Sequence, residues 1–151
     1  MVAEAARGLA ERVRDTLGRL SGDVDLWVAS AGEDGPYLIP LSFLWDGAAV
    51  WVATPSASVT ARNLLGSGRV RLGVGLTRDV TLIDGTVTGV PEGEVDGAVA
   101  EAFAARTGFD PRAEKNAYHY FRIVPRRVLA WREANELAGR VLMREGVWLE
   151  E

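Results

Sequence analysis

Short apolar runs separated by glycine-containing turns most constrain how this chain can fold. Asp34-Gly35 and Asp46-Gly47 each stand between two β-type runs, which is typical of tight hairpins. The predicted strands are 25–30, 37–45, 49–54, 69–76, 80–90 and 120–131, with a closing hairpin over about 141–149. Many short strands with few helices indicate a mainly β protein, either a sandwich or a small barrel.

Three segments have helical character. Apolar residues recur at helical spacing near the N-terminus and predict a helix over about 3–20. Ser56 or Ser58 can cap a second helix over about 57–65, and Asp96 can cap a third that ends at Thr107. No repeat or linker divides the 151 residues, so we expect one domain over 1–151.

Proline and glycine mark irregular points within the predicted strands. Pro40 and Pro125 each lie inside a strand, where the missing N–H indicates an edge, a bend or a site. Gly85 lies inside the strand over 80–90 and predicts a bulge.

Composition excludes several classes of function. With 21 acidic and 17 basic residues the formal net charge is −4, which argues against a nucleic-acid partner. No apolar run approaches the roughly 20 residues of a membrane span, and the charged N-terminus does not resemble a signal peptide. We therefore expect a cytoplasmic protein without a membrane partner. Because the chain has no Cys and one His, thiolate and multi-His metal sites are excluded, and no metal is predicted.

A dense group of polar residues follows the strand over 49–54. Its members are Thr54, Ser56, Ser58, Thr60, Arg62 and Asn63. Helix N-termini bind anions through free N–H groups and the helix dipole, so the group is a candidate anion site. Simple helix capping by Ser and Thr explains part of the same pattern.

Several other residues have both a functional and a structural interpretation. His119 is either a base or haem ligand, or a surface or interface residue beside a strand. Arg69 and Arg71 share one face of a strand, where they either contact a phosphate or are solvated. Trp45 and Trp131 lie at strand ends, where an aromatic wall for a planar ring can form.

Residues 34–64, DGPYLIPLSFLWDGAAVWVATPSASVTARNL, are followed by RVRLGVGL and later by YHYFRIVPRRVLAWRE. This pattern resembles the pyridoxamine 5′-phosphate oxidase-like superfamily, the FMN-binding split barrels, which includes F420-dependent reductases. The resemblance covers about 24–133 and implies a six-stranded antiparallel split β-barrel there, with a few flanking helices. It also implies a homodimer with cofactor grooves between the protomers, and an oxidoreductase that uses FMN or F420 on a small organic substrate.

The resemblance also implies which residues hold the cofactor. The phosphate end would lie near Val52–Thr54 and Ser58–Asn63, and the ring along Ile39–Phe43. The cofactor-binding residues so implied are Pro40, Ser42, Phe43, Thr54, Ser58, Thr60, Arg62, Asn63 and Trp131, and no catalytic residue is identified.

Thr60 stands where members that hold FMN firmly often have lysine, and a hydroxyl does not neutralise a phosphate dianion. An FMN site, an F420 site and an empty site therefore stay open. Two other hypotheses also remain, a non-catalytic cofactor carrier and a haem-binding protein with His119 as its only imidazole.

Overall fold

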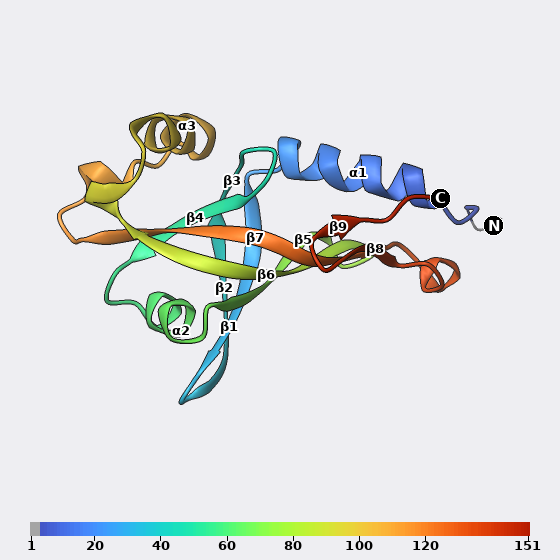
Figure 1. Cartoon of the computed structure of the whole chain (residues 1–151), viewed down its shortest axis with the longest axis horizontal. Coiled ribbons are helices and arrows are strands. Elements are labelled where there is room, and N and C mark those ends of the chain that lie inside the picture. The colour runs from blue at the N-terminus through green and yellow to red at the C-terminus, as the bar shows by residue number, and fades with distance from the viewer. Residues whose placement is uncertain (1–3) are drawn as a thin grey trace.

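The computed structural model describes residues 4–151. Its centre is an antiparallel sheet that curls into a half-barrel, with helices against it (Figure 1). The helices are α1 (Leu9–Gly22), α2 (Val59–Ser67) and α3 (Gly97–Thr107). The strands are β1 (Asp25–Gly32), β2 (Gly35–Ser42), β3 (Leu44–Trp45), β4 (Val50–Pro55), β5 (Arg69–Leu76), β6 (Asp79–Pro91), β7 (Tyr118–Trp131), β8 (Val141–Arg144) and β9 (Val147–Trp148).

The strand order β2-β1-β5-β6-β7-β4-β3 explains the curvature of the sheet. Its two ends, β2 and β3, are consecutive in the chain and are joined through Phe43, so the sheet must bend round toward itself. Six strands are long, namely β1, β2, β4, β5, β6 and β7, while β3, β8 and β9 have two to four residues. The prediction of a six-stranded split barrel is confirmed for this chain.

Buried and more exposed residues alternate along β1, and this alternation distinguishes the two faces of the sheet. Leu26, Val28 and Ser30 are buried and lie on the inner face, whereas Trp27 and Ala29 lie on the outer face. The main core fills the inner side and includes Val28 of β1, with Phe43 and Phe121 as its aromatic members. The inner side therefore carries the core, and the outer face of β1 stays open.

The helices cover different parts of the sheet. α2 packs against β1 and β6, and α3 lies on the other side of the β4–β7 ribbon (Figure 1). Under α3, Phe103 meets Tyr120 edge to face with ring centroids 5.5 Å apart. None of the helices in the described part of the chain is long and apolar enough to cross a membrane.

The N-terminal helix starts later than the sequence predicts. Residues 4–8 are not helical, and α1 begins at Leu9 after an extended Gly8. The reason is tertiary, because Arg7 is drawn into a buried ion pair with Glu136 from the C-terminal region. Ala3, the first residue of the predicted helix, lies outside the described residues.

The strand predicted over 37–45 is interrupted. β2 ends at Ser42, and Phe43 leaves the ladder to bury its ring completely, while its N–H donates to Val24 O. The following turn is organised by Asp46, whose carboxylate accepts from Ala48 N, Ala49 N and Trp51 Nε1. Burial alone would raise the pKa of Asp46, but these hydrogen bonds outweigh it and the pKa is lowered.

The proline and glycine signals are explained by the sheet. Pro40 lies in β2, which is an edge strand, as predicted. The bulge at Gly85 is also confirmed, because the β6–β7 register shifts between Asp84 and Gly85. Pro125 is opposite Gly85 at that bulge, so in the interior strand β7 it marks a bend and not an edge.

Candidate functional site

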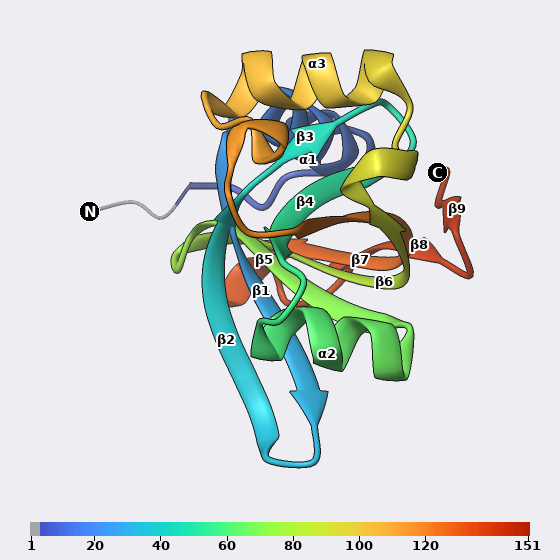
Figure 2. The same ribbon diagram turned by 90° about the vertical axis from the view of Figure 1, so that its left-hand side faces the viewer.

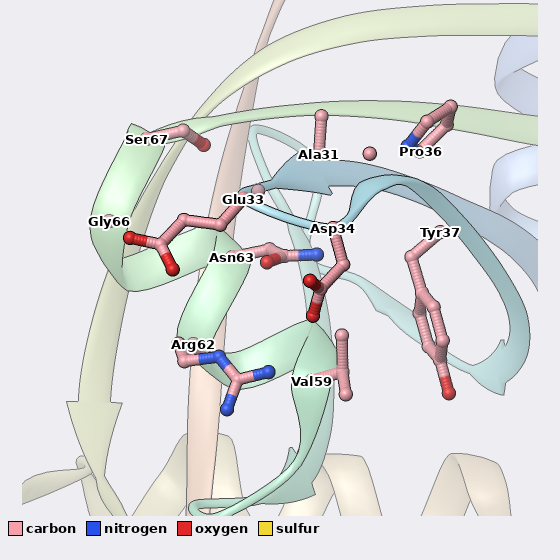
Figure 3. A pocket seen from close by; sticks show the side chains of 12 residues that line it. Ala31, Glu33, Asp34, Pro36, Tyr37, Val59, Arg62, Asn63, Gly66 and Ser67 are labelled. Carbon is pink, nitrogen blue, oxygen red and sulfur yellow. The ribbon is translucent and has the colours of Figure 1, made fainter.

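The β1–β2 hairpin reaches past α2 and encloses a groove with it (Figures 2 and 3). This groove, about 630 Å³ in volume, is called the hairpin groove below. The hairpin contributes Glu33, Asp34 and Tyr37, and α2 contributes Val59, Arg62 and Asn63. Two members of the predicted cofactor set, Arg62 and Asn63, therefore line one cavity.

Ser58 sets where α2 begins. It is the N-cap, and its hydroxyl accepts from Ala61 N at 3.0 Å. The hydroxyls of Thr54 and Ser58 are 3.2 Å apart, which connects the end of β4 to the helix start. Capping therefore occupies Ser58, but the first N–H groups of any helix lack acceptors within it. An anion at this end of α2 would meet those groups and the positive end of the helix dipole.

Asn63 fixes α2 to the sheet. Its Nδ2 donates to Ser30 Oγ at 3.2 Å, in a buried bond. A Cβ built on Gly32 would lie 2.1 Å from Asn63 Oδ1, so only glycine allows this close approach. Asn63 thus holds the helix in place.

Arg62 is the cation of the hairpin groove. Its side chain is exposed and has no carboxylate within 4.0 Å among residues 4–151. In Figure 3 its guanidinium and the carboxylate of Asp34 face the same space. Glu33 and Asp34 bring two negative charges to the opposite wall, so a ligand meets one cation and two carboxylates there.

Thr60 lies in the first turn of α2 but does not line the groove. It is 1% exposed, and its Oγ1 has no hydrogen-bond partner within the described chain. A buried hydroxyl without a partner is costly, so this atom is the unsatisfied polar group nearest the helix start. Arg62 and Thr60 are on different sides of α2, one exposed and one buried, as their spacing predicts.

A serine–histidine contact adjoins the same helix start. Ser56 Oγ lies 2.7 Å from His119 Nδ1, and His119 is in register with Thr54 across β4 and β7. The imidazole also stacks on Phe121, with centroids 5.9 Å apart. One ring nitrogen of His119 is therefore engaged within the chain.

The remaining predicted residues lie elsewhere. Pro40 faces Trp27 and Ser42 faces Asp25, so both are on the outer face, away from α2. Ser42 Oγ donates to Asp25 Oδ1 at 2.7 Å. Phe43 is in the core.

Trp131 ends β7 opposite Val80, whereas Thr54 lies opposite His119 near the start of the same strand. A single chain thus divides the predicted set among the hairpin groove, the start of α2, the core and the outer face.

Sequence reasoning missed the hairpin side of the groove. The Asp34-Gly35 signal predicts only a turn, and Tyr37 only begins the strand predicted over 37–45. The turn signal of Asp34-Gly35 was available, but nothing local indicates that the hairpin folds beside α2. That placement depends on the Gly32–Asn63 approach, which joins distant parts of the sequence.

Comparisons with known proteins agree with this architecture. Residues 24–132 match the family profile described as pyridoxamine 5′-phosphate oxidase. An F420 reductase superposes with a TM-score of 0.62 at 19% identity, covering 84% of this chain and 98% of its own. A FAD-binding protein from Mesorhizobium loti gives a TM-score of 0.61 at 19% identity, with coverages of 76% and 90%.

HutZ, the heme storage protein from Vibrio cholerae, gives a TM-score of 0.60 at 16% identity, with coverages of 78% and 92%. The search of curated proteins finds no significant match. At these identities the structural likenesses show the fold, while the family profile spans most of the sequence. The chain belongs to the pyridoxamine 5′-phosphate oxidase family.

Proposed function

We propose that the protein is a flavin- or deazaflavin-dependent oxidoreductase that uses FMN or F420 on a small organic substrate. The observation that carries this proposal is the hairpin groove, where Arg62 and the start of α2 adjoin the edge strand β2. Family membership and similar structures named for F420 and FAD support the cofactor class.

The residues present fit an anionic cofactor end in part. The start of α2 offers N–H groups and Arg62 offers an exposed cation, whereas Thr60 is buried and does not line the groove. When bound, FMN or F420 would supply hydride chemistry, so the chain needs no nucleophile of its own. Arg62 would orient the anionic end, and Tyr37 would limit the width of the groove.

Titration of the purified protein with FMN and with F420 tests the proposal. We expect at least one cofactor to bind more tightly than about 1 mM, which corresponds to roughly −4 kcal/mol. Arg62→Gln removes the groove's cation and should weaken binding about tenfold, the value of one charge-assisted hydrogen bond. Arg14→Gln removes an equal charge from an exposed position on α1 and should change little. Failure of both cofactors to bind would contradict the proposal.

We also propose that two chains associate through the outer face. Pro40, Trp27, Gly73, Leu82 and Leu129 form one row across β2, β1, β5, β6 and β7, called the apolar row below. Trp27 is 50% exposed, although a side chain of this size is seldom left open without a partner. A second copy would cover the row and bring outer-face residues of both chains together.

A non-catalytic cofactor carrier is the second candidate. The unusual charge balance favours it, because Thr60 supplies no cation and Glu33 and Asp34 face Arg62. Tight cofactor binding without turnover of a broad substrate panel would support the carrier. Reduction of any substrate at a useful rate would exclude it.

A haem-binding protein remains the third candidate, since one similar structure is a heme storage protein. His119 is the only imidazole, and Ser56 already contacts its Nδ1. If His119 is an axial ligand, His119→Ala should abolish the Soret shift on haem addition. An unchanged haem spectrum and affinity would remove His119 from this role.

A further inference from the structure

A second groove lies beside the hairpin groove and opens on the outer face. It has a volume of about 690 Å³ and is called the arginine groove here. Its charged lining consists of Arg69, Arg71 and Arg126 with a single carboxylate, Asp84. Both grooves share Ala31, Pro36 and Ser67, so the tip of the hairpin and the end of α2 separate them.

The charges in the arginine groove are not balanced. Arg71 donates to both oxygens of Asp84, at 2.5 and 3.1 Å, and this pairing raises the pKa of Arg71. Arg69 and Arg126 have no carboxylate within 4.0 Å among the described residues. Three guanidinium groups with one carboxylate leave two excess positive charges, in a protein whose formal net charge is −4. Carboxylates are abundant in this chain, yet residues 4–151 place only one of them on this surface.

The β6–β7 bulge creates this concentration of arginines. Asp84 is in register with Arg127 and Gly85 with Pro125, which leaves Arg126 without an opposite residue. Extra residues of bulges redirect side chains, and here Arg126 lines the same groove as Arg69 and Arg71, with its guanidinium beside Gly146 of the β8–β9 turn.

The backbone of Arg69 is also held in place. Ser67 Oγ accepts from Arg69 N and donates to Arg69 O, both at 3.1 Å. One wall of the groove is therefore anchored to the end of α2, and the other is set by the bulge. The cations are presented by constrained backbone on both sides.

We propose that the arginine groove binds a small polyanion, a ligand or part of a ligand that carries two or more phosphate or carboxylate groups. Guanidinium groups pair with phosphate and carboxylate in bidentate geometry, and two unpaired groups favour a multiply charged partner. The hairpin groove is less suitable for such a ligand, because its one arginine faces two carboxylates. This binding does not depend on the oxidoreductase proposal.

Calorimetric titration at low ionic strength tests the proposal. The probes are pyrophosphate and a triglutamate peptide, and the reference is orthophosphate, which has a single phosphate group. We expect at least one probe to bind the wild-type protein more tightly than orthophosphate does. The difference between the two probes identifies whether phosphate or carboxylate is preferred. Raising the salt concentration should weaken binding, since exposed charges are screened.

Three variants locate the binding. The double variant Arg69→Gln/Arg126→Gln should weaken probe binding about tenfold or more, whereas Arg14→Gln should stay within about twofold. Asp84→Asn should strengthen binding, because it removes the only carboxylate and releases Arg71. Circular dichroism verifies that each variant is folded.

Two results would overturn the proposal: wild-type protein that binds neither probe, or a double variant that binds as Arg14→Gln does. Arg62→Gln separates this site from the hairpin groove. That change should lower FMN or F420 affinity and leave pyrophosphate affinity unchanged. Failure of cofactor binding with intact probe binding would refute only the oxidoreductase proposal.

Discussion

Thr54 and Thr60 are two buried threonines with opposite hydrogen-bonding states. Thr54 is 2% exposed and lies within hydrogen-bond distance of Ser58, whereas Thr60 Oγ1 has no partner in the described chain. Valine has the shape of threonine without the hydroxyl. Thr60→Val should therefore be neutral or stabilise the protein by up to about 1 kcal/mol, because it removes an unsatisfied buried group.

Thr54→Val is the matched control and should cost about 1 kcal/mol, because it breaks the contact with the N-cap residue. Chemical denaturation of both variants measures the difference. Destabilisation of the apo-protein by Thr60→Val would show that the hydroxyl has an internal role.

Glu136 should make folding sensitive to acid. It is 2% exposed and accepts hydrogen bonds from Arg7 N, Nε and Nη2 and from Arg132 N. The hydrogen bonds from Arg7 are the main reason that its pKa falls from 4.5 to about 2. A lowered folded-state pKa stabilises the protein fully above the unfolded value, and this contribution is lost as pH falls from 4.5 toward 2.

Urea unfolding at pH 6, 4 and 3 measures this effect. The free energy of unfolding of the wild-type protein should fall from pH 6 to pH 4 and again to pH 3. In Glu136→Gln the free energy of unfolding should depend less on pH. At pH 6 the same variant should cost about 3 kcal/mol of folding free energy, because the buried Arg7 keeps Asp15 but loses its buried carboxylate partner. Equal pH dependence in wild type and variant would contradict the assignment to Glu136.

At the scale of elements, the β6–β7 bulge requires glycine at position 85. An added Cβ would lie 2.7 Å from Ile123 Cγ2 and 2.9 Å from Val124 O. Val124 O is a backbone atom, so it cannot easily move away. Gly85→Ala should therefore lower the free energy of unfolding by about 2 kcal/mol or more. Gly73→Ala is the control in neighbouring β5, since its nearest contact would be 3.7 Å away. Thermal unfolding compares the two, and similar losses would argue against a bulge-specific requirement.

Local sequence predicted the elements whose causes are local. Ser58 and Asp96 are the N-caps of α2 and α3, and Asp34-Gly35 closes the first hairpin. The predicted start of α1 was wrong, because the Arg7–Glu136 ion pair joins residues at opposite ends of the chain and keeps the first residues out of the helix. The break at Phe43 was missed for a similar reason, since core burial overrides an apolar strand pattern.

The candidate site was predictable only in part. The group from Thr54 to Asn63 could be found because a strand end, a cap and a helix start are adjacent in sequence. Glu33 and Tyr37 could not be found, because their position depends on how the hairpin folds beside α2. The arginine groove was likewise hidden, since a bulge places Arg126 with residues from another strand.

At the scale of the whole molecule, the outer face should join two chains. The apolar row continues beside Leu38, which is 60% exposed, and beside Trp131 at the end of β7. Sedimentation velocity should show a dimer for the wild-type protein. Trp27→Asp puts a charge at the centre of the row and should give a folded monomer, since an unpaired charge is costly in a covered apolar contact.

Leu76→Asp is the control, because Leu76 is also an exposed apolar residue, at 73%, but lies at the β5–β6 turn, away from the row. It should remain dimeric. Pro40, Ser42 and Trp131 lie apart from the hairpin groove, so a cofactor that contacts both sets needs a second chain. The Trp27→Asp monomer should therefore also bind FMN or F420 at least tenfold more weakly. A monomeric wild-type protein with full cofactor affinity would refute the two-chain site and leave the hairpin groove of one chain as the entire binding site.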